Sequence, residues 1–543
     1  MPTPAELIAI MIRDRTMMAN LLDGNSTSAR AKRAYIFGRL LEREIESGSM
    51  FLVAVPESLP FIFVGITQEI IAIPRPRRGG DRFWAYMKRR YGIGENEDHS
   101  KHILDELRAY AFSHGARVNM RRFSAYKAAT QTVYISAYNG SQWRIDGENI
   151  MPIANSEDDV FFIDDDGGIP VVPEVGPNGV LFPQLIDQIS FADAGVGGIS
   201  AIQMKRALII WMFALAFPDL MPTKPMLIVE GAPGSGKSAA MQLLQIALMG
   251  ESKPIHLSAN KPDDFGVILL RSPICVLDNL DSYIDWLPDA VCMYATKGVF
   301  TRRKLFTDAE ELNLKPHAFI AVASKNPSSF RREDTADRLI ILRLERRDTA
   351  GLPFTRMAAL EEQIAALRPQ LLGEYLYYVN RIVAEIRQGA LTTLHDEKFR
   401  MGDFAALARL VGRVLDWEDG VIEELLVAIQ CEQTAFHNEA DPTADLLNKW
   451  LAHRAQGRHN IGRLIDLHDL HKELDFIAQA HSIQMYKQNV LLQKLRSPHI
   501  ERDFIIQPSI IDGTRYYRIW RKSDPQLVSI PMPTNPPDEE GSG

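Results

Sequence analysis

The run Met226-Leu-Ile-Val-Glu-Gly-Ala-Pro-Gly-Ser-Gly-Lys-Ser238 decides the fold of the centre of this chain. It begins as a short apolar strand, turns through several glycines and leads into residues 239–249, whose apolar spacing predicts a helix that Gly250 ends. Residues 231–238 match the pattern G-x-x-x-x-G-K-[S/T] at every fixed position. A strand before the pattern and a helix after it are the context that makes the match specific, so we predict a phosphate-binding loop here.

The chemistry of this loop predicts that it binds ATP with Mg²⁺. Backbone N–H groups of a glycine-rich turn can point inward at phosphates, and the N-terminus of the following helix adds positive potential. Lys237 is expected to reach the β and γ phosphates, and Ser238 is expected to ligate Mg²⁺. We therefore predict an α/β P-loop NTPase core that hydrolyses ATP. The predicted nucleotide-binding residues are Gly231, Ala232, Pro233, Gly234, Ser235, Gly236, Lys237, Ser238 and Ala239.

A second apolar strand, Ile274-Cys-Val-Leu-Asp278, follows the loop at a spacing that suits a P-loop core. Its terminal Asp278 is predicted to bring a carboxylate to the Mg²⁺ ion. Many nucleotide-driven motors place a glutamate directly after this aspartate to activate the attacking water, but here Asn279 stands in that position. An amide can orient a water molecule but cannot take its proton. Either Asp281 substitutes for the missing carboxylate or hydrolysis is slow.

A third apolar strand is predicted at residues 317–324 and ends on a polar side chain. In a P-loop core such a residue can lie between the ends of the two earlier strands. Ser324 is predicted to position the attacking water there, with Asn326 as the alternative.

Beyond this strand lies an arginine-rich segment, residues 330–342. An arginine in this place can reach the γ-phosphate of a neighbouring subunit and stabilise the transition state, and Arg332 is predicted to do so. The alternative is a local salt bridge from Arg332 to Asp334 or Asp337, and Arg338 is as readily structural.

Two local basic segments stand out in a chain of net charge −8. Arg302, Arg303 and Lys304 lie at a predicted hairpin tip and suit contact with phosphates of a single DNA strand, the alternative being a solvated turn. Residues 75–122 hold twelve Lys and Arg against six Asp and Glu, with aromatic residues interleaved at 83–91. That mixture suits single-stranded nucleic acid, but an amphipathic helix with a basic face explains it equally well.

The remaining chain predicts further units. Asn139-Gly140 between two β-rich runs predicts a hairpin, and residues 155–179 read as a linker. The predicted domains are an N-terminal α+β module at 1–195 of uncertain role, the core at 196–350, a helical subdomain at 351–440, a winged-helix domain at 444–522 and a disordered tail at 523–543.

Cysteine usage and hydropathy predict a cytoplasmic protein. Cys275, Cys292 and Cys431 show no CxxC pairing, so we expect buried thiols in a reducing compartment. The longest apolar run, at 207–217, is too short to span a bilayer, and charged residues interrupt the early apolar stretch that a signal peptide would need.

Residues 222–345 resemble the AAA+ ATPase core of replicative helicases from phages and mobile elements, which are related to superfamily 3 viral and MCM-like helicases. The resemblance is carried by GAPGSGKS from 231, VLDNLD from 276, TRRKLFTDAEE from 301 and RREDTADRLIIL from 331. It extends less specifically over about residues 200–522, through Arg400-Met-Gly-Asp-Phe and the winged unit. The chain departs at Lys325 and Asn326, where relatives tend to have a plainer Asn/Thr-Gly turn.

The resemblance implies a helical lid on the core, a ring of six subunits around one DNA strand and a pore hairpin that pulls the strand. We therefore expect an ATP-dependent DNA helicase or translocase in mobile-element replication. One alternative is an ATPase switch that assembles on DNA without unwinding it. Another is an antiviral or protein-remodelling AAA+ assembly, in which residues 1–195 bind a protein.

Overall fold

The computed structural model divides the chain into two compact units, residues 1–434 and 435–543. The residues that the structure describes are 4–23, 29–55, 57–75, 80–97, 99–164, 168–253, 255–257, 262–297, 300–303, 311–314, 316–346, 356–390, 399–439, 443–456, 464–480, 487–496, 500–501, 504–511 and 514–522.

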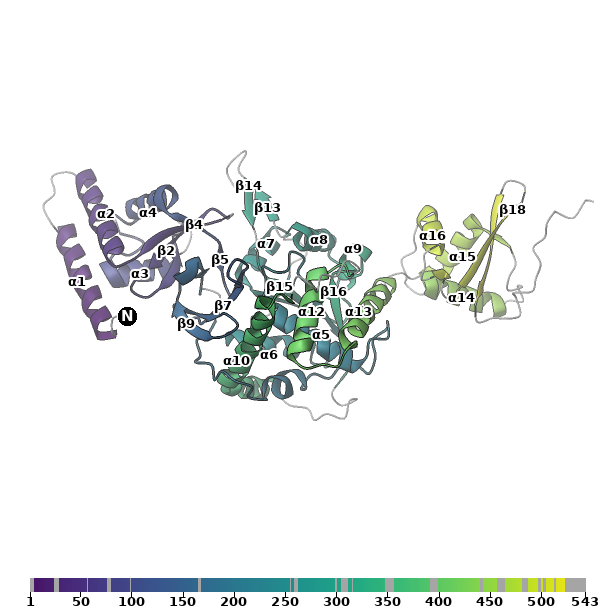
Figure 1. The fold of residues 1–543 in the computed structure, drawn as a ribbon. Helices are drawn as coiled ribbons and strands as arrows, with labels where there is room; N and C mark the ends of the chain where they lie inside the picture. Colours follow the sequence, from purple (N-terminus) through teal and green to yellow (C-terminus); the bar gives the residue numbers. More distant parts are fainter. Residues whose placement is uncertain are drawn as a thin grey trace, which may run out of the picture. The chain divides into compact units, whose positions relative to one another are not determined.

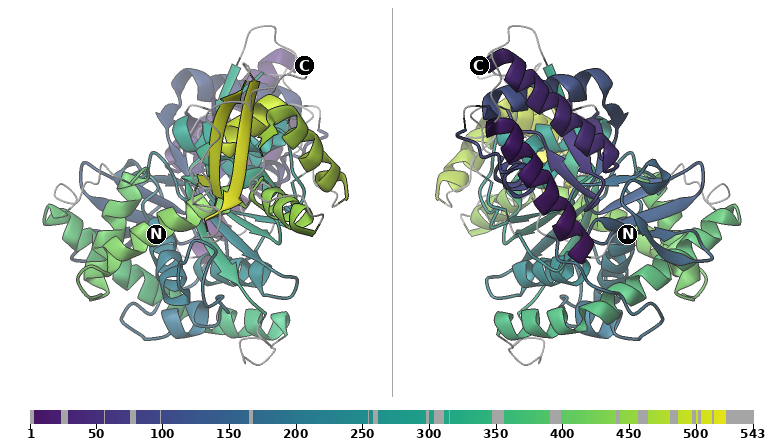
Figure 2. Two further views of the ribbon diagram at one scale, coloured as in Figure 1. Left: turned by 90° about the vertical axis from the view of Figure 1, so that its right-hand side faces the viewer. Right: turned by 90° about the vertical axis from the view of Figure 1, so that its left-hand side faces the viewer.

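The N-terminal part of the first unit is built on a four-stranded sheet. The strands are β1 (Met50–Ala54), β2 (Leu59–Val64), β3 (Glu69–Ala72) and β4 (Ala116–Val118), in the order β3-β2-β1-β4. Only β4 runs parallel to its neighbour, because α3 (Asp81–Tyr91) and α4 (Ser100–His114) connect it to β3. Helices α1 (Pro4–Asp23) and α2 (Ala29–Glu46) lie side by side (Figures 1 and 2). This segment therefore contains both helices and strands, as the predicted α+β module requires.

The aromatic residues of α3 form core and not a stacking surface for nucleic acid. Phe83, Tyr86 and Tyr91 are at most 4% exposed, and Trp84 is 7% exposed. Arg90 is also buried, where its guanidinium pairs with Glu44 at 2.9 Å and with Asp14 at 3.2 Å. The exposed face of the helix carries Arg82, Lys88 and Arg89. The amphipathic helix with a basic face is therefore the correct reading, and base stacking by these aromatics is wrong.

A second sheet, made of four antiparallel strands in sequence order, joins the N-terminal segment to the motor. Its strands are β6 (Ser124–Lys127), β7 (Thr132–Ser136), β8 (Ser141–Ile145) and β9 (Ile150–Ala154). The predicted Asn139-Gly140 hairpin is confirmed, with positive φ at Tyr138 and Gly140. One face of this sheet belongs to the same apolar core as the motor helices.

The segment predicted as a linker is held against the motor. Phe161–Phe162 forms β10, which pairs with β5 (Met120–Arg121). Further along, the N–H of Ile169 donates to the carbonyl of Met249 at 2.8 Å, and the N–H of Glu174 donates to that of Pro369 at 2.9 Å. These described residues are therefore packed in place instead of linking two independent bodies.

The motor is a parallel sheet in the order β12-β15-β11-β16. Helix α6 (Lys237–Met249) follows β11 directly, and Trp211 of α5 is fully buried in the core. Helix α5 ends at Ala214, shortly before Pro218, which disfavours helical backbone in the residue that precedes it. The strands are β11 (Met226–Gly231), β12 (Ile274–Asp278), β15 (Phe319–Ser324) and β16 (Leu339–Leu344).

Helices and one hairpin complete the first unit. The hairpin pairs β13 (Phe300–Arg303) with β14 (Glu311–Leu314). The long predicted helices appear as α10 (Met357–Arg387), α12 (Gly402–Val414) and α13 (Val421–Asn438), the last of which runs into the second unit. The shorter helices are η1 (Glu157–Asp159), η2 (Phe182–Ile186), α5 (Ala201–Ala214), α7 (Pro262–Arg271), α8 (Leu287–Lys297), η3 (Ser328–Phe330) and α9 (Glu333–Ala336).

The second unit has three helices and a three-stranded antiparallel sheet among its described residues. The helices and the sheet of this unit are seen in Figure 2, left. Residues 523–543, predicted to be a disordered tail, lie outside the described residues. The elements are α14 (Thr443–Gln456), β17 (Ile465–Asp466), α15 (Leu467–Ala480), α16 (Gln488–Leu495), β18 (Phe504–Ile511) and β19 (Thr514–Arg521).

The three cysteines are free thiols of differing exposure. Cys275 is buried, Cys292 is half-buried and Cys431 is exposed, so the expectation of three buried thiols is wrong for Cys431. Burial raises the pKa of the Cys275 thiol to about 12, which makes it unreactive. In the part of the chain that the structure describes, no helix is long and apolar enough to cross a membrane.

Candidate nucleotide site

Four of the predicted catalytic residues, Lys237, Asp278, Asn279 and Ser324, lie at one edge of the motor sheet. Strands β11, β15 and β12 are parallel, and the register pairs Glu230 with Ser324 and Asp278 with Ala323. Parallel strands end at the same edge of a sheet, so the phosphate loop and Asp278 lie there with the end of β15 between them. The prediction that the third strand lies between the other two is therefore confirmed.

The phosphate loop has the backbone conformation that its glycines permit. Gly234 and Gly236 both have φ of 83°, a left-handed value that L side chains rarely adopt. Gly231 is needed for a different reason, because a Cβ there would lie 2.4 Å from the carbonyl oxygen of Leu344. No heavy atom lies within 4 Å of a Cβ built at Gly234 or Gly236, so that side of the loop is open.

Lys237 begins α6 and folds its side chain back over the loop. Its Nζ donates to the carbonyl oxygens of Gly231 at 2.7 Å and Ala232 at 2.9 Å. Burial lowers the pKa of this ammonium, while Asp281, Asp278 and Glu230 oppose the shift. The cation is thus held against a loop that is open to a ligand, where a phosphate would be a better partner than two neutral carbonyls.

Ser238 and Asp278 form a pair of oxygen donors. The Ser238 hydroxyl donates to Oδ1 of Asp278 at 2.6 Å, and Asp278 is 9% exposed at the end of β12. Hydroxyl and carboxylate oxygens are the ligands that Mg²⁺ prefers, and Mg²⁺ bound with a nucleotide needs only one or two such groups from the protein. The two residues therefore fit the predicted ion. Among the described residues, no cluster of three or more His, Cys, Asp or Glu side chains could hold a metal ion.

Asn279 occupies a strained position next to this pair. Its φ is 56°, in the left-handed region that asparagine tolerates better than most residues. Its N–H donates to Oδ1 of Asp278 and to the carbonyl of Ala323, both at 3.0 Å, while the residue itself is exposed. This backbone geometry gives Asn279 a structural reason to be asparagine.

Ser324 is fully engaged with Asp281. The serine is 1% exposed, and its hydroxyl lies 2.8 Å from Oδ1 of Asp281 and 3.0 Å from the carbonyl oxygen of Leu280. The same oxygen accepts the N–H of Asn326 at 3.0 Å. Because its one proton is already used and it is buried, Ser324 does not present a donor to an attacking water. The Ser324 hydroxyl is thus directed to Asp281, and its part in positioning the attacking water stays a prediction.

Asp281 is the carboxylate that sequence reasoning left as an alternative. Its Oδ1 also accepts the N–H of Lys325 at 2.9 Å, and its Oδ2 lies 3.6 Å from the Lys325 ammonium. Burial acts to raise the pKa of Asp281, but these hydrogen bonds and the Lys325 charge outweigh it, so the pKa lies below its usual value. Asp281 is therefore a fixed, ionised carboxylate beside the phosphate loop.

The three arginines beyond β15 differ sharply in environment. Arg331 is buried and its guanidinium donates to Glu230 at 2.9 Å. Arg338 is also buried and donates to the carbonyl of Asp334. Only the Arg332 side chain, which is 44% exposed, extends to solvent. Of the three, Arg332 is the one whose position permits contact with another subunit.

Within one subunit Arg332 is held by two aspartates. It lies 2.6 Å from Asp289 and 2.8 Å from Asp334, and the hydrogen bonds to these carboxylates raise its pKa further above its usual value. Asp337 pairs instead with Arg400 at 2.5 Å. Of the two local partners considered for Arg332, Asp334 is therefore present and Asp337 is not.

A buried ionic chain behind the phosphate loop was not predicted from the sequence. Glu230, the last residue before the loop glycine, accepts from Arg331 at 2.9 Å and from Arg343 at 2.8 Å. Arg343 also reaches Glu432 of α13 at 2.9 Å, and Glu432 accepts the N–H of Gly197 at 2.6 Å. Glu230, a charged residue at the end of an apolar strand, was the sequence signal that could have indicated it. These ion pairs connect the phosphate loop to helix α13.

The predicted DNA-binding triplet lies only partly in described structure. Arg302 and Arg303 form the end of β13, opposite Leu312 and Glu311 of β14. Lys304 lies outside the described residues. The hairpin itself is present, and the role of the three cations stays a prediction.

Comparison with known proteins points to replication. Residues 194–416, which contain the phosphate loop and all of the residues placed at the sheet edge, match the family model described as the replication protein of actinomycete integrative conjugative elements. The motor segment is thus similar to a mobile-element replication family. No curated protein matches the chain.

The solved structures that match this chain have low sequence identity and low structural similarity to it. The A-form apo structure of the NrS-1 C-terminal region has 12% sequence identity and a TM-score of 0.41, and the match covers 89% of this chain and 98% of that one. A JCV helicase in complex with a phenoxyphenyl acetamide compound has 13% identity and a TM-score of 0.19, with 48% of this chain and 74% of that one covered. Likeness at these scores is too low to assign a function.

Proposed function

We propose that this protein is an ATP-driven DNA helicase or translocase that works as a ring, an expected hexamer, in the replication of a mobile element. The observation that carries the proposal is the convergence of Lys237, the Ser238–Asp278 pair and Asp281 at one sheet edge. Such an edge, with an arginine exposed nearby, is the arrangement that nucleoside triphosphate hydrolysis between subunits requires. The match to a replication family supports DNA as the partner.

Each residue has a distinct task in the proposed hydrolysis. The loop N–H groups and Lys237 bind the phosphates, and Ser238 and Asp278 would hold Mg²⁺, which neutralises phosphate charge. The water oxygen forms a bond to the γ phosphorus while the bond from phosphorus to the β–γ bridging oxygen breaks. ADP keeps the electron pair of that bond.

Asp281 is the proposed acceptor of the water proton. Asn279 cannot take a proton, and Ser324 is buried with its hydroxyl directed to Asp281. The serine hydroxyl and the Lys325 N–H bind Oδ1, and the proposed water therefore approaches Oδ2, beside the Lys325 ammonium at 3.6 Å. In the proposed AAA+ motor the catalytic carboxylate is therefore Asp281, three residues after Asp278, and not the residue directly after it.

Asp281→Asn is expected to slow ATP hydrolysis by about 10²-fold or more, the usual contribution of a positioned base. The amide keeps the hydrogen-bond geometry but cannot accept the proton, so nucleotide affinity should change little. Phosphate release gives kcat, and a fluorescent ATP analogue gives the affinity.

Asn279→Gly is the matched control for Asp281→Asn. Glycine adopts the φ of 56° without strain and removes the amide. We expect this variant to keep most of the hydrolysis. The reverse result, with Asn279→Gly inactive and Asp281→Asn active, would contradict the proposal. It would show that the Asn279 amide orients the water and that the only role of Asp281 is to bind Lys325.

The DNA part of the proposal is tested on the hairpin. Replacing Arg302, Arg303 and Lys304 together with alanine should abolish the stimulation of ATPase by single-stranded DNA and leave basal hydrolysis intact. Each lost phosphate contact should also flatten the salt dependence of binding, by about 0.7 in log–log slope. ATPase measured against oligonucleotide concentration at two salt levels checks both effects.

Three results would separate this proposal from its rivals. Strand separation by the wild-type protein distinguishes a helicase from a switch that assembles on DNA. A rate of ATP hydrolysis that does not change when DNA is added would favour a protein-remodelling assembly. A triple variant that DNA stimulates as strongly as wild type would show that the hairpin is a solvated turn, and translocation through it would then be excluded.

A further inference from the structure

Glu230 connects the phosphate loop to the arginine-rich segment beyond β15. It is 8% exposed and directly precedes the first loop glycine, Gly231. Its Oε1 accepts from the Arg331 guanidinium at 2.9 Å, and its Oε2 accepts from that of Arg343 at 2.8 Å. Arg331 is in turn the neighbour of Arg332 in the chain. One buried carboxylate therefore ties the start of the loop to the residue beside the exposed arginine.

The backbone around Arg332 is anchored on both sides. Phe330 is fully buried, and the carbonyl of Arg332 accepts the N–H groups of Thr335 at 3.0 Å and Ala336 at 2.7 Å, at the start of α9. The ion pair of Arg331 adds a third anchor, to the end of β11. With Arg331 directed inward and the backbone held, the Arg332 side chain extends outward, where it is 44% exposed.

The ion pair between Glu230 and Arg331 can be broken without leaving a buried charge unpaired. Removing one partner of such a pair is normally strongly destabilising, because the other charge stays behind. Here Glu230 keeps Arg343, which also pairs with Glu432 at 2.9 Å. Glu230 is the less suitable residue to change, because its charge also counters the lowering of the Lys237 pKa by burial. Replacement of Arg331 therefore tests the anchor itself, and the phosphate loop should stay folded.

We propose that Arg331 is a positioning residue for Arg332, and that its ion pair with Glu230 sets where the neighbouring guanidinium meets the next subunit. The inference rests on the proposed hydrolysis between subunits, in which Arg332 contacts a phosphate bound by the adjacent phosphate loop. A displacement of about 1 Å in a group that contacts the reacting atoms can cost about 10²-fold in rate. An anchor directly beside that arginine is thus part of the proposed arrangement, although Arg331 itself touches no substrate.

Arg331→Gln is expected to lower kcat by about tenfold or more and to leave nucleotide affinity within about threefold of wild type. The loop of the altered subunit is intact, but its Arg332 is no longer held in register with the neighbour. Mixing these subunits with Lys237→Ala subunits should therefore restore activity, to the same extent as mixing Arg332→Ala with Lys237→Ala. Phosphate release by the full-length protein gives kcat, and a fluorescent ATP analogue gives the affinity.

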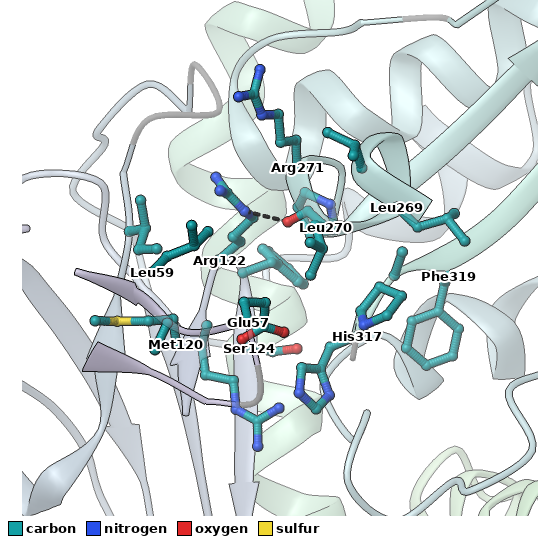
Figure 3. Close-up of a pocket in the computed structure, with 18 of the residues that line it drawn as sticks. Glu57, Leu59, Met120, Arg122, Ser124, Leu269, Leu270, Arg271, His317 and Phe319 are labelled. Carbon is teal, nitrogen blue, oxygen red and sulfur yellow. Dashed lines mark hydrogen bonds between the residues drawn. The ribbon is translucent and has the colours of Figure 1, made fainter. Parts of the chain in front are cut away.

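Arg331→Lys and Arg122→Gln are the matched variants. Lysine keeps the charge that pairs with Glu230 but loses the planar fork of arginine, so kcat should fall less than with glutamine. Arg122 lies beside the cavity shown in Figure 3, which Phe319 lines from the start of β15, at the edge of the sheet opposite the phosphate loop. Its Nε donates to the carbonyl of Leu270 at 2.5 Å, so Arg122→Gln removes an anchored arginine away from the nucleotide site and should turn over as wild type.

The outcomes separate this inference from the proposed function. No rescue in the reference mixture of Arg332→Ala with Lys237→Ala would show that Arg332 does not act in trans, and that part of the proposed function and this inference would both be wrong. Rescue there, combined with near-wild-type kcat in Arg331→Gln, would overturn the positioning role alone. The same holds if Arg331→Gln loses nucleotide affinity or is not rescued, because Arg331 would then serve its own phosphate loop through Glu230. If Arg331→Gln does not fold, Arg331→Lys is judged by the same rescue.

Discussion

Lys237→Ala is expected to abolish ATP hydrolysis while the protein stays folded. The ammonium now rests on two loop carbonyls, at 2.7 and 2.9 Å, and is positioned to transfer to the phosphates of a bound nucleotide. Without it, negative charge that develops in the transition state is left uncompensated. Loss of one preorganised donor of this kind costs about 10²- to 10³-fold in kcat. Alanine favours the first turn of α6, so the helix itself should form.

Phosphate release measures this effect, and thermal unfolding verifies the fold. Lys205→Ala is a suitable control, because Lys205 is a lysine of α5 whose partner is Asp187, away from the phosphate loop. We expect wild-type turnover from it. Turnover within a few-fold of wild type in Lys237→Ala would remove the basis for the nucleotide site, since no other described lysine contacts the loop carbonyls.

Arg332→Ala is expected to lower kcat by about 10³-fold or more, the contribution of an arginine that reaches a neighbour's γ-phosphate. Nucleotide binding should survive, because the phosphate loop of the same subunit is intact. Mixing Arg332→Ala with Lys237→Ala subunits should restore part of the activity. In such a mixed ring, one type of interface contains both an intact loop and an intact arginine.

Asp289→Asn separates this role from a local ion pair. Asp289 is highly exposed and lies 2.6 Å from Arg332, so its loss frees the guanidinium without removing it. An arginine that acts in trans should still support hydrolysis in this variant. If Asp289→Asn reproduces the defect of Arg332→Ala, and mixed rings with intact assembly show no rescue at any ratio, the arginine is structural.

Local patterns predicted much of the fold. The strand, glycine loop and helix around residues 226–249 are encoded by neighbours in the chain, so the sequence alone placed the phosphate loop correctly. The Asn139-Gly140 hairpin is equally local, because a short turn with positive φ at Tyr138 and Gly140 is enough to reverse the chain. The helix α3 was also predictable as amphipathic, but whether its aromatics faced a core or a ligand was not.

The candidate site was predicted in part. Lys237, Ser238 and Asp278 follow from spacing, and the structure brings them together as expected. Asp281 was named only as an alternative, because the hydrogen bond that holds it to Ser324 joins residues 43 positions apart and could not be predicted. The choice of Arg332 over Arg331 depends on Glu230, which lies 101 positions from Arg331.

The sequence by itself therefore determined that this protein has a phosphate loop, a carboxylate strand after it and a cationic hairpin. Those features rest on residues that are close in the chain, where backbone conformation and side-chain periodicity are set locally. Only the tertiary structure decided that Asp281 is held by Ser324 and Lys325, and that Arg332 reaches solvent while Arg331 is buried. Both features depend on burial and on partners from distant segments of the chain. Neither the burial nor the partners can be predicted from a short stretch of sequence.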